Sequence, residues 1–168
     1  MKFWVKLAAI ILTLLAILTI VFTVEVGGYK KYLSKVRYYA FENGVEISLV
    51  LAVMKTESNF NKNARSSKGA IGLMQVMPET AKFISSKIGF SEEINLFDED
   101  TNIRLGVAYL KYLTHKFSNL EVVLWAYNAG EGRVKKWLDE GHTFPPYNET
   151  KTYSKKVLLR KRLYEILI

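Results

Sequence analysis

Eighteen consecutive uncharged residues, at positions 7–24, restrict the fold of this chain more than any other feature of its sequence. As an α-helix rising about 1.5 Å per residue, the run would be about 27 Å long, which is close to the hydrocarbon thickness of a bilayer. Lys2 and Lys6 precede the run, and Trp4 lies where interfacial aromatic residues are usual. The pattern therefore predicts a helix that enters a membrane.

A cleaved signal peptide and a retained signal anchor both begin in this way. The segment VFTVEVGGY at positions 21–29 has no small-x-small pattern for cleavage, and the apolar run is longer than the core of an ordinary signal peptide. We therefore expect residues 1–28 to be a retained transmembrane anchor and residues 29–168 to form one domain. Flanking charge leaves the orientation open, because more basic residues follow the run than precede it, while long domains cross membranes largely regardless of charge.

The composition excludes several kinds of chemistry. The chain has no cysteine, so it has no disulfides, thiolate metal sites, catalytic thiols or lipid-modified N-terminal cysteine. Its two histidines, His115 and His142, are far apart in sequence and lack the spacing of metal ligands. We expect no metal and no cofactor.

The chain is basic, with 24 Lys and Arg against 16 Asp and Glu and a formal charge of +8. A basic surface suits an anionic polymer or a membrane, although an ordinary solvated surface accounts for most of these lysines. The charge is scattered, and no zinc-finger, RNP or homeodomain signature is present. We therefore expect no nucleic-acid partner.

Helical periodicity dominates the sequence after the apolar run, and strand alternation is nearly absent, which predicts a mainly α domain. Asp98 is a suitable N-cap for a helix whose apolar stripe contains Gly106, and a glycine in such a stripe predicts close contact with another element. The expected helices cover residues 29–42, 45–57, 78–89, 99–117, 120–128, 131–138 and 149–168.

The second of these helices ends in an acid. Ile47, Val50, Met54 and Glu57 follow at intervals of 3, 4 and 3, so they share one helix face. Partial burial and the negative end of the helix dipole would both raise the pKa of Glu57, and a glutamic acid that stays protonated near neutral pH can act as a general acid in glycoside cleavage. On spacing alone, a solvated helix end with Glu57 paired to a lysine is the simpler interpretation.

The segments around Glu57 favour catalysis instead. Residues 57–81, ESNFNKNARSSKGAIGLMQVMPETA, strongly resemble the catalytic core of the soluble lytic transglycosylases, a family of lysozyme-like enzymes that cleave peptidoglycan. Three further stretches match in the family's order: NIRLGVAYLKYL from position 102, AYNAGEGRVKKWL from position 126 and FPPYNETKTYSKKVL from position 144. The resemblance covers about residues 45–160, and the hallmarks E-S, G-L-M-Q, A-Y-N and E-T are intact. It implies a lysozyme-like transglycosylase domain behind one transmembrane helix.

The resemblance also implies roles for individual side chains. Glu57 corresponds to the family's single catalytic acid and base. The counterpart of Ser66 lies beside that acid and helps to place the substrate's N-acetyl group, and the counterpart of Tyr127 faces the acid. Gln75 is expected to bind sugar, and Glu149 to line the groove. The expected substrate-binding residues are Ser58, Ser66, Met74, Gln75, Tyr127, Asn128 and Glu149.

Structural explanations stay open for several of these residues. Met74 suits the filling of an irregular gap in a core, because methionine is flexible. Tyr127 follows an apolar run, where an aromatic side chain is ordinarily part of the core. Asn128 could simply end a helix, and Glu149 could be a first-turn acid that favours the helix dipole.

The implied reaction cleaves the β-1,4 bond between N-acetylmuramic acid and N-acetylglucosamine and leaves a 1,6-anhydromuramic acid end. A hydrolytic muramidase of the same fold is an alternative, and it would use a second carboxylate about 5 to 9.5 Å from the first. Glu149 and Glu79 are the candidates for that second acid. A glycan-binding envelope scaffold without catalysis is a third possibility.

The implied substrate also gives a location. Peptidoglycan lies outside the cytoplasm, so the resemblance implies a single-pass protein of a bacterial cytoplasmic membrane with its catalytic domain outside. The expected partners are glycan strands and the membrane itself. A protein partner in a cell-envelope assembly stays open.

Overall fold

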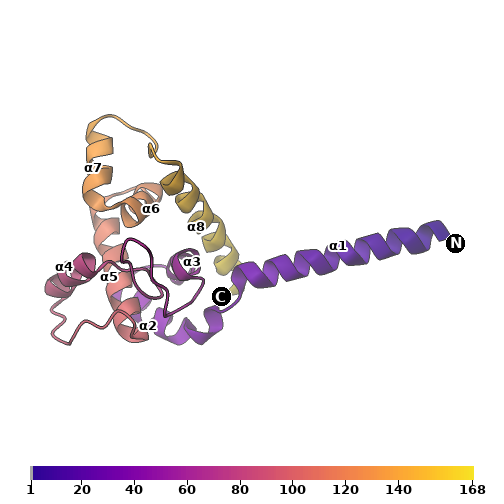
Figure 1. Ribbon diagram of the computed structural model, residues 1–168, viewed down its shortest axis with the longest axis horizontal. Helices are drawn as coiled ribbons and strands as arrows, with labels where there is room; N and C mark the ends of the chain where they lie inside the picture. Colours follow the sequence, from indigo (N-terminus) through magenta and orange to yellow (C-terminus); the bar gives the residue numbers. More distant parts are fainter. Residues whose placement is uncertain (1) are drawn as a thin grey trace.

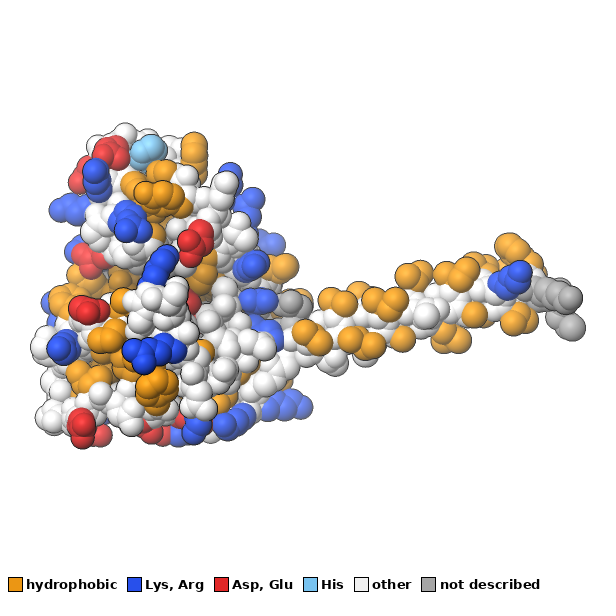
Figure 2. All heavy atoms as spheres, viewed as in Figure 1, with side chains coloured by type: hydrophobic (Ala, Val, Ile, Leu, Met, Phe, Trp, Pro, Cys, Tyr) orange, Lys and Arg blue, Asp and Glu red, His pale blue; other side chains and the backbone are white. Residues whose placement is uncertain are grey.

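The computed structural model describes residues 2–168, without the side chains at positions 2, 25 and 26. A long helix, α1 (Lys2–Val26), projects from a helical body (Figure 1). The described side chains of α1 are exposed, and the span Phe3–Lys31 is long and apolar enough to cross a membrane by length and composition. Apolar side chains cover α1, whereas charged side chains of both signs are spread over the body (Figure 2). The anchor and the domain boundary after residue 28 stay predictions.

The body is built from helices joined by short connections and one long loop. Within the described residues 2–168 there is no β-strand, and the expected mainly α class is confirmed. The loop at residues 59–77 contains two isolated antiparallel bridges, which join Ile71 to Arg65 and to Val76. The elements of the body are η1 (Tyr29–Lys31), α2 (Leu33–Asn43), α3 (Ile47–Ser58), α4 (Pro78–Ile88), α5 (Glu99–Lys116), α6 (Leu120–Ala129), α7 (Glu131–Asp139) and α8 (Asn148–Leu167).

Local chemistry explains most helix ends. Pro78 lies in the first turn of α4, where its missing N–H leaves no hydrogen bond unmade. Asp98 caps α5 as expected, since its carboxylate accepts a hydrogen bond of 2.8 Å from the backbone N–H of Thr101. The helix expected from residue 45 begins at Ile47 instead. The N–H of Val45 closes the end of α2 by donating to the carbonyl of Ala40, and Glu46, the N-cap of α3, has an extended backbone with φ −64° and ψ 130°.

Helix α3 lies at the centre of the body. It packs mainly against α8 and also against α2, and its five residues from Val50 to Met54 are fully buried. Helix α5 packs against α2, α4 and α6, while α6 packs against α7 and α8. The close contact predicted at Gly106 is confirmed, because a Cβ there would lie 2.5 Å from Sδ of Met74.

The base of α1 is attached to the body, close to the C-terminus of α8 (Figure 1). The buried Tyr29 ring contacts Tyr164 of α8 at a centroid distance of 5.5 Å. Gly28 has φ +87°, and a Cβ there would lie 3.0 Å from the ring of Phe60. The ammonium of Lys55, in the last turn of α3, donates to the carbonyl of Val24. The end of α1 is therefore connected to both α3 and α8.

Candidate active site

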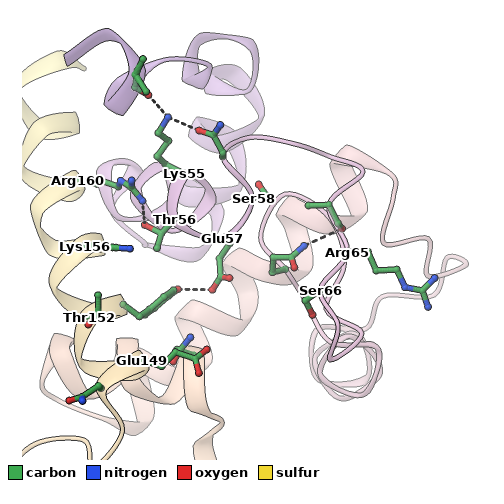
Figure 3. Close-up of a pocket in the computed structure, with 17 residues that line it drawn as sticks. Lys55, Thr56, Glu57, Ser58, Arg65, Ser66, Glu149, Thr152, Lys156 and Arg160 are labelled. Atoms are coloured by element: carbon green, nitrogen blue, oxygen red, sulfur yellow. Dashed lines mark hydrogen bonds between the residues drawn. The ribbon is translucent and has the colours of Figure 1, made fainter. Parts of the chain in front are cut away.

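Glu57 ends the buried face of α3, and its carboxyl group faces a cleft. The hydroxyl of Tyr153, from α8, donates a hydrogen bond of 2.7 Å to Oε1 of Glu57 (Figure 3). Burial raises the pKa of Glu57 to about 7, and the hydrogen bond from Tyr153 opposes part of that rise. The elevated pKa expected for an acid at the end of an apolar stripe is confirmed, with burial as its main cause.

Two tyrosines, the buried Tyr153 and the partly buried Tyr127, lie close to this acid. Burial, together with the charge of Glu57, raises the pKa of both Tyr127 and Tyr153 well above the usual value. Both therefore stay protonated and act as donors. The hydroxyl of Tyr127 donates to the backbone carbonyl of Met74 at 2.8 Å. The tyrosine that is bonded to the acid is thus Tyr153, which the sequence interpretation did not single out.

Side chains named from the sequence hold the loop at residues 59–77 along the cleft. Ser58 Oγ donates to the carbonyl of Leu73 at 2.7 Å. Gln75 Nε2 donates to the carbonyls of Ala64 and Gly72 at 3.1 and 2.9 Å. Ser66 Oγ accepts a hydrogen bond of 3.0 Å from the N–H of Ala70. These polar groups fix the shape of the loop.

Asn102 is a second residue that the sequence interpretation did not identify. It is 1 % exposed. Its Nδ2 donates to the carbonyls of Ile71 and Leu96, and its Oδ1 accepts from the N–H of Met74, each at 2.8 Å. A Cβ at Gly72 would lie 2.2 Å from Nδ2 of Asn102, so only glycine fits there. The one available signal was a polar residue on the core face of α5, at the start of NIRLGVAYLKYL.

The other expected residues differ in their exposure. The side chain of Met74 is fully buried against Gly106. Asn128 lines the cleft, and its Oδ1 accepts a hydrogen bond of 3.0 Å from the hydroxyl of Thr150. Glu149 also lines the cleft, where its largely exposed carboxylate is 3.9 Å from Nζ of Lys68.

The cleft has a volume of about 960 Å³. Glu57 lies between two walls, one formed by α8 and the other by the loop that carries Arg65 and Ser66 (Figure 3). Val24, near the end of α1, lines the cleft at one end. Besides Glu57, Glu149 is the acidic residue among the described residues that line this space. Glu79, the other candidate for a second acid, lies outside the cleft in the first turn of α4.

The family model described as "Transglycosylase SLT domain" matches residues 34–149. The soluble lytic murein transglycosylase of Escherichia coli K12 is 37% identical over 139 residues, which cover 74% of this chain and 22% of that protein. The membrane-bound lytic murein transglycosylase C of Edwardsiella ictaluri is 43% identical over 116 residues, which cover 62% of this chain and 32% of that protein.

Solved structures agree with these relatives. The 70-kDa soluble lytic transglycosylase of Escherichia coli superposes with a TM-score of 0.74 at 32% identity, covering 81% of this chain and 24% of that one. An inactive mutant of the lytic transglycosylase Slt from Pseudomonas aeruginosa superposes with a TM-score of 0.70 at 37% identity, covering 78% of this chain and 23% of that one. The lysozyme-like transglycosylase fold expected from the sequence is confirmed. The chain spans about a fifth of the length of the first of these relatives.

Proposed function

Because the chain belongs to the transglycosylase SLT domain family, we propose that it cleaves peptidoglycan strands as a membrane-anchored lytic transglycosylase. The observation that carries this proposal is Glu57, an acid with a pKa of about 7 that faces an open cleft and accepts a hydrogen bond from Tyr153. A general acid works best when its pKa is close to the working pH.

The proposed reaction uses Glu57 twice. Its protonated carboxyl gives a proton to the glycosidic oxygen as the bond from C1 of N-acetylmuramic acid to that oxygen breaks. The substrate's own N-acetyl group stabilises the positive charge at C1. The carboxylate then takes the proton of the 6-hydroxyl while O6 bonds to C1, so a 1,6-anhydro ring forms and no water is consumed. Tyr153, which donates to Oε1, holds the carboxyl in one orientation through both steps.

We propose two kinds of role for the residues around the acid. Ser66, Gln75, Asn128 and Glu149 line the cleft and are proposed to contact the glycan. Three others are proposed to act mainly on the shape of the site through the contacts described above: Ser58, Met74 and Tyr127.

The proposed location is the outer side of a bacterial cytoplasmic membrane, with residues 1–28 as a retained single-pass anchor and the N-terminus inside. The apolar span Phe3–Lys31 and the membrane-bound relatives support anchoring. N-terminal sequencing of the mature protein tests the anchor, because a start near Tyr29 would show that the segment is removed. Protease added to intact protoplasts tests the orientation and should digest the domain.

A second candidate is hydrolysis, which is favoured by one observation: Glu149 lines the same cleft as Glu57. Mass spectrometry of digested glycan strands separates the two reactions. The transglycosylase gives 1,6-anhydro ends, while a muramidase gives reducing ends that are heavier by one water. A parallel digestion with Glu57→Gln tests catalysis itself. An inactive but folded variant supports the proposal, whereas a variant with full biological activity supports a scaffold that only binds glycan.

A further inference from the structure

Helix α8 presents a stripe of functional side chains to the cleft. Glu149, Tyr153, Lys156 and Arg160 follow at intervals of 4, 3 and 4, which places them on one helix face, and all four line the cleft. Because Tyr153 is bonded to Glu57, the stripe has an acid on one side of the catalytic carboxyl and two cations on the other (Figure 3). Lys156 is three residues beyond Tyr153, or about 4.5 Å along the helix axis.

Lys156 has an ammonium group available to a ligand. It is exposed, and among the residues that the structure describes, no side chain forms an ion pair or hydrogen bond with it. Arg160 is held beside it, one turn along α8, where its Nη1 donates to the hydroxyl of Thr56 at 3.1 Å. That bond ties Arg160 to the residue before Glu57, so its guanidinium has a fixed place relative to the catalytic acid.

This end of the cleft also touches α1. Val24 lines it, and Lys55 connects the carbonyl of Val24 to α3 two residues before Glu57. Figure 2 shows Lys and Arg side chains gathered along the edge of the body that faces α1. With α1 in a membrane, a group bound beside Lys156 would lie close to the bilayer surface.

An anionic group is a better ligand than a neutral sugar for this end of the cleft. A sugar hydroxyl can accept a hydrogen bond from the ammonium of Lys156, but an anion adds the attraction between opposite charges. The opposite end carries Asn128 and Asn148, whose amides suit sugar hydroxyls. The contrast indicates that the two ends bind chemically different parts of one strand.

We propose that Lys156, with Arg160 beside it, forms a subsite for an anionic substituent of the glycan strand. The inference rests on the proposed function. Two anions of peptidoglycan fit: a carboxylate of the peptide stem, and the diphosphate that joins an unfinished strand to its lipid carrier. Both form charge-assisted hydrogen bonds with an ammonium or a guanidinium group. The diphosphate is the one that lies at the membrane surface.

The test uses the full chain in detergent and three forms of strand: one with free stem carboxylates, one with amidated stems, and one with amidated stems that keeps the lipid diphosphate. Wild type should cleave one of the anionic forms with a kcat/KM about 10-fold above that of the neutral form, and salt should reduce the difference. Lys156→Gln should bring this ratio close to one. Lys156→Arg should restore most of it.

The matched control is Lys155→Gln, because Lys155 is also exposed but does not line the cleft. It should keep the ratio of wild type. A preference for free carboxylates identifies the peptide stem as the ligand, and a preference for the diphosphate identifies a strand still joined to its lipid. Equal cleavage of all three forms by wild type would overturn the subsite. So would an equal fall of the kcat/KM ratio in Lys155→Gln and Lys156→Gln.

Binding separates this inference from the proposed function. Dissociation constants for the same three strands are measured with Glu57→Gln alone and with Glu57→Gln combined with Lys156→Gln. Tighter, salt-sensitive binding of an anionic strand that depends on Lys156 supports the subsite even when no strand is cleaved. Anhydro products from wild type without any such dependence would leave the proposed function standing and remove the subsite.

Discussion

The two walls of the cleft use polar side chains in opposite ways. The α8 wall is a regular helix that satisfies its own backbone, so Lys156 and Glu149 can face the cleft without forming part of its scaffold. The loop wall is irregular, and besides its own backbone hydrogen bonds it is held by the side chains of Gln75 and Asn102, which donate to its carbonyls or accept from its N–H groups. Polar motif residues in the loop therefore help to hold the shape of the loop, whereas those on α8 are available to substrate.

The largest expected effect is at Glu57, which lies between the two walls. Glu57→Gln removes the proton donor and should lower kcat by about 10³-fold, the middle of the range for loss of general acid catalysis. The release of anhydro-ended fragments measures this. The helical circular dichroism should not change, and near-normal turnover by the folded variant would contradict the assigned role.

Asn102→Ala tests whether side-chain hydrogen bonds hold the loop wall in place. Removing this buried amide leaves three backbone groups without their partner, so the free energy of unfolding should fall by about 3 kcal/mol. Chemical denaturation measures the change. The control is Asn119→Ala, which removes one exposed cap on the N–H of Glu121 and should cost only about 1 kcal/mol. Equal losses in the two variants would mean that Asn102 does not hold the loop.

The burial of Glu57 should also make the free energy of unfolding depend on pH. Its pKa in the folded protein, about 7, is above the ordinary value of 4.5, so the folded state binds this proton more tightly than the unfolded state does. The free energy of unfolding should therefore fall as pH rises from 4.5 through 7. Glu57→Gln lacks this fall and should be more stable than wild type by about 3 kcal/mol above the folded pKa. Parallel curves for the two proteins would disprove the burial of the charge.

The smallest expected effect separates the two tyrosines. Tyr153→Phe removes a hydrogen bond that lowers the pKa of Glu57, so the alkaline limb of the pH profile of kcat should move to higher pH. Tyr127→Phe removes a bond to the loop carbonyl of Met74 and should reduce stability without moving that limb. Equal shifts in both variants would remove the distinction between Tyr153, which acts on the acid, and Tyr127, which holds the loop.

Local patterns in the sequence were enough for much of the fold. Pro78 and Asp98 mark the starts of α4 and α5 because their effects act within one helical turn. Helix α3 begins two residues later than expected, because the N-cap Glu46 has an extended backbone after the turn that closes α2. The close contact at Gly106 was predicted from spacing, but its partner, Met74, could not be.

The sequence by itself determined the apolar span, the helical class, the family and the place of Glu57 at the end of an apolar helix stripe, since these follow from composition, periodicity and continuous motifs. Only the tertiary structure decided that Tyr153, 96 positions away, donates to Glu57, that Asn102 supports the loop and that Lys156 lines the cleft beside the end of α1. The physical reason is that burial and hydrogen-bond partners depend on how α3, α5 and α8 pack, and no local pattern encodes which residues of distant helices will meet.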